Sequence, residues 1–252
     1  MADGTAGKEI QLWCLAGAGG SATAFAHWRR RFDPRVRPNA LELPGRGHRL
    51  REPPLHDIAG VLADLIAFVR PRLAARFAFF GHSLGGVIAA ECCRRLERDG
   101  IGIAEHLFVA GAPAPHDVQR SRSGRPRSDV EVTEYLRRLN GTPPELLDQP
   151  DFKALLMPAI RADFAILDSY RYQAETCGPL SCPITVVAGT DDPAIGPDAL
   201  KEWRRHTSSR FALAVIDGDH FISMRSAAVT DLIQSALLRG TCGAGALPCP
   251  GR

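Results

Sequence analysis

Short apolar segments alternate with longer helical patterns along this chain of 252 residues, and this alternation constrains the fold more than any other feature. The apolar segments lack alternating polar residues, which is typical of parallel strands buried on both faces. We expect strands at 10–16, 39–43, 76–80, 106–112, 183–189 and 210–216, and helices at 21–32, 56–75, 84–98, 197–206 and 222–238. The pattern predicts an α/β fold with a mostly parallel central sheet flanked by helices.

One interval breaks this rhythm, because residues 113–182 separate two expected strands by far more than one crossover helix requires. Within it, "VEVTEYLRRL" and "DFKALLMPAIRADFAILDSYRY" have helical patterns and are separated by "NGTPP". We expect Pro158 to kink the second helix. A helical insertion between late strands is typical of a lid. We therefore expect a single domain at 9–239 that contains this lid, between a disordered tail at 1–8 and a flexible tail at 240–252.

Composition indicates a soluble globular protein that acts without nucleic acid or a membrane. The formal net charge of +3 is too small to predict nucleic-acid binding, and the arginines of "RSRSGRPR" (120–127) lie in a segment typical of a solvated loop. Seven cysteines without CxxC spacing argue against a disulfide framework and a zinc site. No apolar run approaches the length of a membrane span, and "MADGTAGKEI" lacks a signal-peptide core. We expect a reduced, cytoplasmic protein.

The segment "GHSLG" (81–85) fits the G-x-S-x-G nucleophile elbow, in which a serine occupies a strained turn between a strand and a helix. Glycines on both sides of the serine allow the strand and the helix to approach each other. The helix N-terminus directs backbone N–H groups toward the reacting carbonyl. We expect Ser83 to be the nucleophile, and we expect His82 to point away from it in a structural role.

A serine hydroxyl needs a base, and the base needs an acid that orients it. "VVAGTDDPAI" places Asp191 and Asp192 after one expected strand, and "AVIDGDHF" places His220 after the next. Both segments therefore lie at carboxyl ends of parallel strands, on the same edge of the sheet as Ser83. We predict a triad of Ser83, Asp192 and His220. The spacing G-x-x-D from Gly189 favours Asp192, and Asp191 remains the alternative acid.

The segment "CLAGAGGSATAF" (14–25) permits a different interpretation. Gly17, Gly19 and Ala22 satisfy G-x-G-x-x-A between a strand and a helix, and Glu42 lies at the end of the next expected strand. This arrangement imitates a dinucleotide-binding fingerprint. A nucleotide-dependent oxidoreductase is therefore the remote alternative for the function.

The same glycines have a second use in a serine hydrolase, where the loop after an early strand supplies an N–H group to the oxyanion hole. We expect the backbone N–H groups of Ala18 and Leu84 to be the two donors. This interpretation also uses Ser83, Asp192 and His220, which the oxidoreductase leaves as unrelated coincidences. We therefore expect a serine hydrolase without cofactor or metal.

With these motifs, the chain resembles the stand-alone type II thioesterases of polyketide and nonribosomal-peptide assembly lines, members of the α/β-hydrolase superfamily. The motifs that carry the resemblance, from about residue 10 to 238, are "LWCLAGAGGSATAFAHW", "LPGRGHRLREPP", "FGHSLGG", "LNGTPPELL", "LLMPAIRADFAILDSYRY", "GTDDPAI" and "GDHF". The resemblance implies hydrolysis of acyl thioesters on the phosphopantetheine arm of an acyl or peptidyl carrier protein. It also implies a monomer.

The resemblance assigns the nucleophile to Ser83, the base to His220 and the acid to Asp192, with the backbone of Ala18 and Leu84 as oxyanion donors. The chain departs from the family pattern in two places. Many members have His before "AGG", where this chain has Gly, and the segment after "HLFVAGA" lacks a Ser-Gly-Arg start. The first departure keeps a backbone donor but loses any role of the histidine side chain. The second concerns the entry to the lid and carrier docking, and not the chemistry.

The second lid helix carries an apolar stripe, which is normally part of a core. Its members are Phe152, Leu155, Leu156, Ile160, Phe164 and Leu167. The functional interpretation is that part of the lid walls an acyl channel, with Met157 and Phe164 as candidate substrate-binding residues. Two related functions stay open. A generic carboxylesterase would share the triad but prefer oxygen esters, and an acyltransferase or cyclising thioesterase would pass the acyl group to an amine or hydroxyl.

Overall fold

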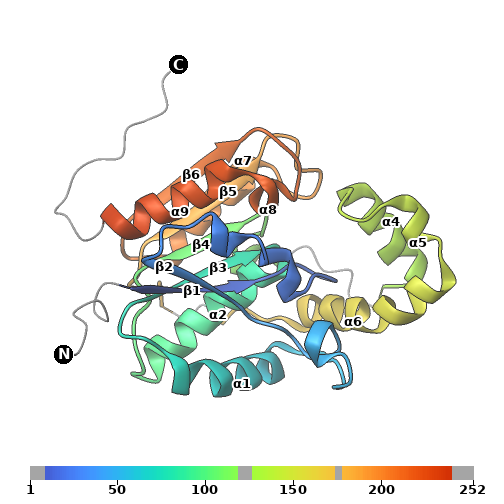
Figure 1. Cartoon of the computed structure of the whole chain (residues 1–252), viewed down its shortest axis with the longest axis horizontal. Helices are drawn as coiled ribbons and strands as arrows, with labels where there is room; N and C mark the ends of the chain where they lie inside the picture. The colour runs from blue at the N-terminus through green and yellow to red at the C-terminus, as the bar shows by residue number, and fades with distance from the viewer. Residues whose placement is uncertain (1–8, 119–126, 174–177, 240–252) are drawn as a thin grey trace.

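Six parallel strands form the sheet of the computed structural model, which describes residues 9–118, 127–173 and 178–239 (Figure 1). The strands are β1 (Ile10–Leu15), β2 (Val36–Ala40), β3 (Phe77–His82), β4 (Leu107–Ala110), β5 (Ile184–Gly189) and β6 (Phe211–Ile216). Their order across the sheet is β2-β1-β3-β4-β5-β6, and every neighbouring pair is parallel. The predicted α/β architecture is confirmed. Both expected tails, and residues 120–126 of the arginine-rich segment, lie outside the described residues.

Helices cover both faces of the sheet, which explains why the strands other than β2 are mainly apolar. On one face, Phe79 of β3 packs in a cluster with α1 (Ile58–Val69) and α2 (Leu84–Arg98). The next residue, Phe80, points to the other face and packs in a cluster with α9 (Ala227–Arg239). Figure 1 shows α1 and α2 on one side of the sheet and α9 on the other.

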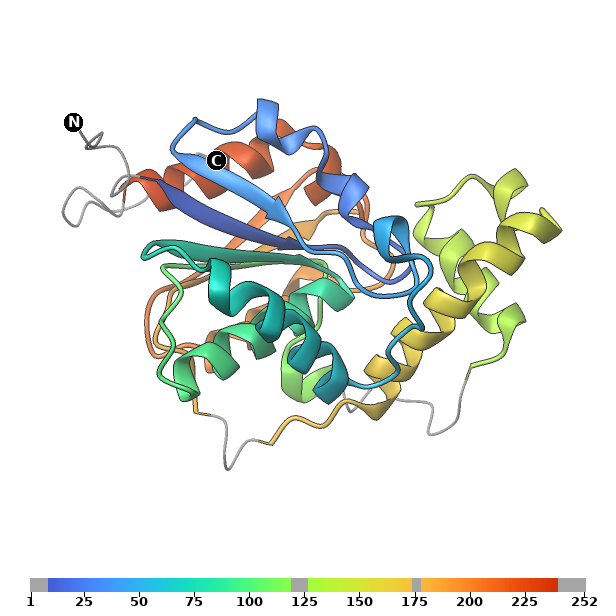
Figure 2. The same cartoon turned by 60° about the horizontal axis from the view of Figure 1, so that its bottom comes forward.

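The long interval between β4 and β5 contains helices, as the sequence predicts. They are α3 (Pro115–Val118), α4 (Asp129–Leu139), α5 (Pro144–Leu147) and α6 (Pro150–Ser169). A capping box of Ser128 and Glu131 begins α4, and Asn140, with φ 55°, ends it. The helix α6 continues through Pro158. Figure 2 shows α4, α5 and α6 set to one side, beyond the carboxyl ends of the strands.

The second strand begins three residues earlier than the sequence analysis predicts. It pairs with β1 from Ile10↔Val36 to Cys14↔Ala40. The strand contains Pro38, which lacks the N–H that a central strand needs, but β2 lies at the edge of the sheet and needs no bond on its outer side. Because "VRPNA" contains polar residues and a proline, it lacks the apolar pattern that predicts the other strands.

Several expected helices are shorter than predicted or are 3₁₀ turns. The segment 21–32 forms two 3₁₀ turns, Ala22–Phe25 and Trp28–Arg30, and α1 is followed by a third at Arg70–Arg72. The segment 197–206 is the short helix α7 (Pro197–Leu200), followed by a 3₁₀ helix at Lys201–His206. The last helix divides at Ser226 into α8 (Ile222–Arg225) and α9. The spacing of apolar residues in a short segment does not distinguish an α-helix from a 3₁₀ helix, because both bury one face. Within the described part of the chain, no helix combines the length and apolar character needed to cross a bilayer.

Two buried histidines should make the folded protein sensitive to acid. Burial lowers the pKa of His82 to about 3 and the pKa of His106 to about 3. As the pH falls below about 6.5, the ordinary histidine pKa, both rings bind a proton in the unfolded chain. In the folded protein they remain neutral until the pH reaches about 3. Stability is therefore complete above this window and falls as the pH falls through it, by about 1.4 kcal/mol per pH unit for each ring.

Urea unfolding of the wild type and of His106→Gln tests this effect at one ring. The Nε2 atom of His106 lies 2.8 Å from Thr185 Oγ1, so glutamine keeps a polar partner for Thr185 but does not titrate. Between about pH 7.5 and about pH 5, we expect the wild type to lose about 2 kcal/mol more stability than the variant. Equal losses would show that protonation of His106 does not oppose folding.

Candidate active site

Ser83 occupies the turn between β3 and α2 in a backbone conformation that few residues other than glycine adopt. It lies between His82, the last residue of β3, and Leu84, the first residue of α2, and has φ 52° and ψ −121°. A Cβ atom at Gly81 would lie 2.1 Å from the carbonyl oxygen of Gly85. Glycine is therefore required where the strand and the helix meet. The structure has the elbow that "GHSLG" predicts.

His220 and Asp192 form a buried hydrogen bond at the ends of β6 and β5. The Nδ1–H of His220 donates to Asp192 Oδ2 over 2.8 Å, and both side chains are 1% exposed. The other carboxylate oxygen of Asp192 accepts a hydrogen bond from the N–H of Ala194 over 2.8 Å. Because a carboxylate only accepts, Nδ1 of His220 carries a proton, which in the neutral ring leaves the lone pair on Nε2.

Asp191 lies apart from this pair. Its side chain is exposed, and its Oδ2 accepts a hydrogen bond from Thr190 Oγ1 over 3.1 Å. Its backbone N–H donates to the carbonyl oxygen of Gly218 over 2.9 Å. The structure thus brings Asp192 to His220 and places Asp191 in the turn that follows β5.

The end of β4 lies against both the elbow and the His220–Asp192 pair. The N–H of Ser83 donates to the carbonyl oxygen of Ala110 over 2.8 Å. A Cβ atom at the next residue, Gly111, would lie 3.1 Å from His220 Cε1 and 3.3 Å from Asp192 Oδ2. The Nε2 atom of His220 is buried, and no described residue forms a hydrogen bond with it. A free imidazole lone pair at this position is what a base for a nearby hydroxyl requires.

His82 has the structural position that the sequence predicts. Its Nε2–H donates to the backbone carbonyl oxygen of His220 over 2.9 Å. Its ring packs against the rings of His220 and Phe221, with centroid separations of 4.7 Å and 5.3 Å. His82 therefore fixes the segment that carries His220 and makes no contact of its own with a reacting atom.

The glycine-rich loop after β1 packs directly against the elbow. A Cβ atom at Gly17 would lie 3.1 Å from the Cβ of Ser83. The N–H of Gly19 donates to Asp163 Oδ2 over 2.7 Å. In contrast, the N–H of Ala18 has no acceptor among the described residues. The N–H of Ala18 therefore has no acceptor next to Gly17, the loop residue that packs on Ser83.

Leu84 supplies a second N–H group. It is the first residue of α2, where helix geometry leaves backbone N–H groups without a partner inside the helix. The positive end of the helix dipole lies at the same place. Ala18 thus follows the loop residue that packs against Ser83, and Leu84 directly follows Ser83 in the chain. That their two N–H groups stabilise a developing oxyanion stays a prediction.

A cavity of about 510 Å³ lies beside the elbow, between the sheet and the inserted helices. Its lining includes Ser83, Leu84, Tyr135, Phe164, Leu167 and Ile195. A second cavity of about 200 Å³ is lined by the glycine-rich loop, His82 and the α6 residues Phe152, Leu156 and Ile160. The apolar stripe of α6 is thus divided between two cavities, except for Leu155, which is exposed and lines neither. Met157 is buried between α4 and α6, in a cluster with Val132, Ile160 and Phe164.

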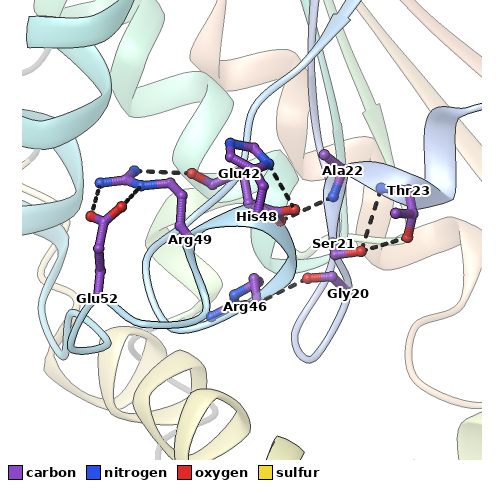
Figure 3. Close-up of polar contacts among 9 residues, drawn as sticks. All are labelled: Gly20, Ser21, Ala22, Thr23, Glu42, Arg46, His48, Arg49 and Glu52. Carbon is purple, nitrogen blue, oxygen red and sulfur yellow. Dashed lines mark hydrogen bonds and ion pairs between the residues drawn. The ribbon is translucent and has the colours of Figure 1, made fainter.

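Glu42 is bound by the protein's own groups rather than left free for a ribose. Its Oε1 accepts a hydrogen bond from the N–H of Ala22 over 3.0 Å, and Oε2 lies 3.6 Å from His48 Nδ1 (Figure 3). Burial raises the pKa of Glu42, and its contacts with Ala22 and His48 act in the opposite direction. The strand order also differs from the 3-2-1-4-5-6 order of dinucleotide-binding folds. Both findings argue against the nucleotide-binding interpretation.

The sequence does not predict that two charged residues of this region pair with each other. Arg46 and Asp163 form a buried ion pair with an N–O separation of 2.7 Å, which joins α6 to the segment after β2. The motifs "LPGRG" and "RADF" contain them, but no spacing in the sequence connects the two motifs.

The sequence matches one protein family over almost its whole described length. A family model described as "Thioesterase domain" matches residues 10–237. The chain belongs to the thioesterase family. This confirms the resemblance found in the motifs, and the thioesterase is an enzyme that hydrolyses thioester bonds.

Known relatives and solved structures are similar over most of their lengths. The thioesterase is 36% identical over 221 residues to linear gramicidin dehydrogenase LgrE of Brevibacillus parabrevis, covering 86% of this chain and 83% of LgrE. It is 35% identical over 216 residues to thioesterase PikA5 of Streptomyces venezuelae, covering 85% and 75% of the two chains. The structure of BorB, a type II thioesterase from the borrelidin biosynthetic cluster, superimposes with a TM-score of 0.80 at 35% identity, covering 91% of this chain and 93% of BorB.

Proposed function

We propose that this thioesterase releases acyl groups from the phosphopantetheine arm of acyl or peptidyl carrier proteins, through an acyl-Ser83 intermediate. The proposal includes a monomeric enzyme in the cytoplasm that serves a polyketide or nonribosomal-peptide assembly line. The names of LgrE and BorB, which refer to gramicidin and to the borrelidin cluster, support this setting. The observation that carries the mechanism is the buried His220–Asp192 hydrogen bond beside a serine at a strand–helix elbow.

In the first half of the reaction, His220 Nε2 accepts the proton of Ser83 while the hydroxyl attacks the thioester carbonyl. Asp192 holds the imidazole with its proton on Nδ1 and stabilises the charged ring. The N–H groups of Ala18 and Leu84 donate to the oxyanion, and one such donor contributes about 3 kcal/mol to the transition state. His220 Nε2 then returns the proton to the sulfur as the tetrahedral adduct collapses, so the phosphopantetheine thiol leaves and the acyl-serine remains.

In the second half, His220 activates a water molecule that attacks the acyl-serine, and the free acid leaves. Water as the acceptor distinguishes this reaction from acyl transfer to an amine or hydroxyl. Trapping the intermediate tests the assignment directly. After brief mixing with an acyl thioester and acid quench, we expect the acyl mass on the peptide that contains Ser83. Turnover without an acylated peptide at that residue would contradict the mechanism.

We propose further that the inserted helices form a lid and that the cavity beside Ser83 accepts the acyl group. Phe164 lines this cavity, and Met157 packs beside Phe164 in the wall behind it. Phe164→Trp and Met157→Trp should therefore reduce the space for a long acyl chain. Each lost methylene contact is worth about 0.8 kcal/mol, so we expect kcat/KM for a decanoyl thioester to fall by about tenfold or more. An acetyl thioester should change by less than about threefold, because it does not reach the wall.

The measurement is the chain-length profile of each variant from acetyl to decanoyl thioesters. Leu155→Trp is the matched control, because Leu155 lies on the same helix and is 53% exposed. The control should keep the wild-type profile. If both Met157→Trp and Phe164→Trp also kept it, the acyl group would not occupy this cavity.

A further inference from the structure

The ion pair between Arg46 and Asp163 is unusual for its burial and its position. The two side chains are 7% and 0% exposed, respectively. Arg46 NH1 donates to Asp163 Oδ2 over 2.7 Å, and NH2 donates to Oδ1 over 2.7 Å. A buried pair of this kind is weak evidence for a role in stability alone, because both charges lose their hydration. The contacts that the pair makes with other groups therefore matter more.

Both partners also bind the glycine-rich loop beside Ser83. Asp163 Oδ2 accepts the N–H of Gly19 over 2.7 Å. Arg46 NH1 donates to the carbonyl oxygen of Gly20 over 3.3 Å (Figure 3). The pair thus binds one turn of the loop through an acceptor on Asp163 and a donor on Arg46. Because Asp163 belongs to α6, these contacts connect the loop to that helix.

The loop has a conformation at these contacts that favours glycine. Gly19 has φ +73°, a left-handed conformation, and a Cβ atom there would lie 3.0 Å from the Ile160 side chain of α6. The N–H of Gly20 donates to the carbonyl oxygen of Gly17 over 2.9 Å. With Gly19 and Gly20 both engaged, the loop keeps the N–H of Ala18 without an acceptor among the described residues.

We propose that Asp163, held by Arg46, is a positioning residue through which α6 orders the oxyanion loop and leaves the Ala18 N–H group free for the substrate. This inference rests on the proposed serine mechanism and deepens it. Asp163 contacts no reacting atom, so its effect passes through the backbone of Gly19. The adjacent residue, Phe164, lines the cavity beside Ser83, so an acyl group that displaced α6 would also disturb the oxyanion loop.

Asp163→Asn tests the proposal, because it keeps the size of the side chain but replaces one accepting oxygen with an NH2 group. Both oxygens accept from N–H groups in the wild type, so either orientation of the amide breaks contacts that hold the loop. We expect kcat for an acyl thioester to fall by about 10²-fold, the usual cost of a misplaced oxyanion donor, while KM changes by less than about threefold. Affinity for an acyl trifluoromethyl ketone, which forms an oxyanion adduct with the serine, should fall by the same factor as kcat/KM. A matched methyl ketone, which stays planar, should bind as tightly as to the wild type.

The matched control is Asp129→Asn, which breaks an exposed ion pair between α4 and Arg161 of α6 without touching the loop. It should keep kcat within about twofold of the wild type. Should Asp163→Asn fail to fold, the double variant Arg46→Met/Asp163→Leu replaces the pair with apolar side chains, which buried sites often tolerate. That variant also removes the acceptor for Gly19 and should show the same loss of kcat.

The outcomes separate this inference from the mechanism on which it rests. If the wild type hydrolyses the thioester and a folded Asp163→Asn or double variant keeps wild-type kcat and ketone affinity, the positioning role is wrong and the mechanism stands. If the wild type forms no acyl-Ser83, the mechanism itself fails. Hydrogen exchange of the peptide that spans residues 15–22 then still reports whether Asp163 orders the loop, and unchanged exchange in the variants would overturn that role too.

Discussion

Ser83→Ala should abolish thioester hydrolysis, with kcat lower by about 10⁵-fold or more. His220 and Asp192 activate the serine hydroxyl and do not attack the carbonyl in its place. The fold should survive, since alanine removes only the hydroxyl and keeps the Cβ atom at a turn where φ is 52°. Rates of thiol release, measured with a thiol reagent on purified protein, give the effect. Equal melting temperatures of the variant and the wild type show that the loss is chemical.

Ser181→Ala provides a matched control for this variant. The hydroxyl of Ser181 is exposed and bonds to Glu97, at the opposite end of α2 from Ser83. Its removal should leave kcat unchanged within about twofold. A Ser83→Ala enzyme with substantial activity would mean that water, or another residue, attacks the thioester directly.

Asp192→Asn should lower kcat by about 10⁴-fold with little effect on KM, because the amide can donate to His220 Nδ1 and favour the wrong tautomer of the ring. In the folded enzyme, Asp192 Oδ2 accepts from that nitrogen over 2.8 Å, which leaves the lone pair on Nε2. With the proton moved to Nε2, the ring cannot accept the proton of Ser83. Steady-state kinetics on a short acyl thioester measure the change.

Asp191→Asn is the matched control, since it makes the same chemical change one residue earlier. Asp191 is exposed and bonds to Thr190, so the substitution should change kcat by less than about threefold. The reverse result, with a large loss at Asp191 and a small one at Asp192, would assign the acid to the other residue. Two small losses would show that His220 needs no orienting carboxylate.

The parts of the fold and site that the sequence predicts are those with a local signal. Ser83 could be placed because the glycines on either side of it form a local motif. Gly81 is required by a contact within the turn, and Gly85 by the carbonyl oxygens of Leu15 and Ala16. His220 and Asp192 could be placed because each follows an apolar strand, and parallel strands bring their carboxyl ends to one edge. The order of the strands places the ends of β3, β5 and β6 on one half of that edge, where the segments that carry the three residues follow.

What the sequence could not predict depends on packing between distant segments. Arg46 and Asp163 are 117 residues apart, and only the position of α6 over the glycine-rich loop brings them together. The edge strand β2 was misplaced because its sequence, VRPNA, contains polar residues and Pro38. Glu42 imitated the acidic residue of a dinucleotide-binding fingerprint, since a sequence does not show that the N–H of Ala22 already occupies the carboxylate.

The relation to LgrE bears on this last point, because the name of that protein refers to a dehydrogenase. The loop at 17–20 could serve a nucleotide only if its backbone groups were free for phosphate. In this chain, Gly19 and Gly20 are engaged by Asp163, Arg46 and Gly17. The family match and the elbow at Ser83 both favour thioester hydrolysis.

The most direct test of the account compares two substrates that carry the same acyl group. A propionyl-loaded carrier protein and p-nitrophenyl propionate are offered to the wild type and to Ser83→Ala, and release of propionate is followed by mass spectrometry. We predict that the wild type has the higher kcat/KM for the carrier-bound thioester and that the variant cleaves neither. Cleavage of the free ester alone would contradict the carrier-protein function and would make the protein a general esterase that uses the same serine.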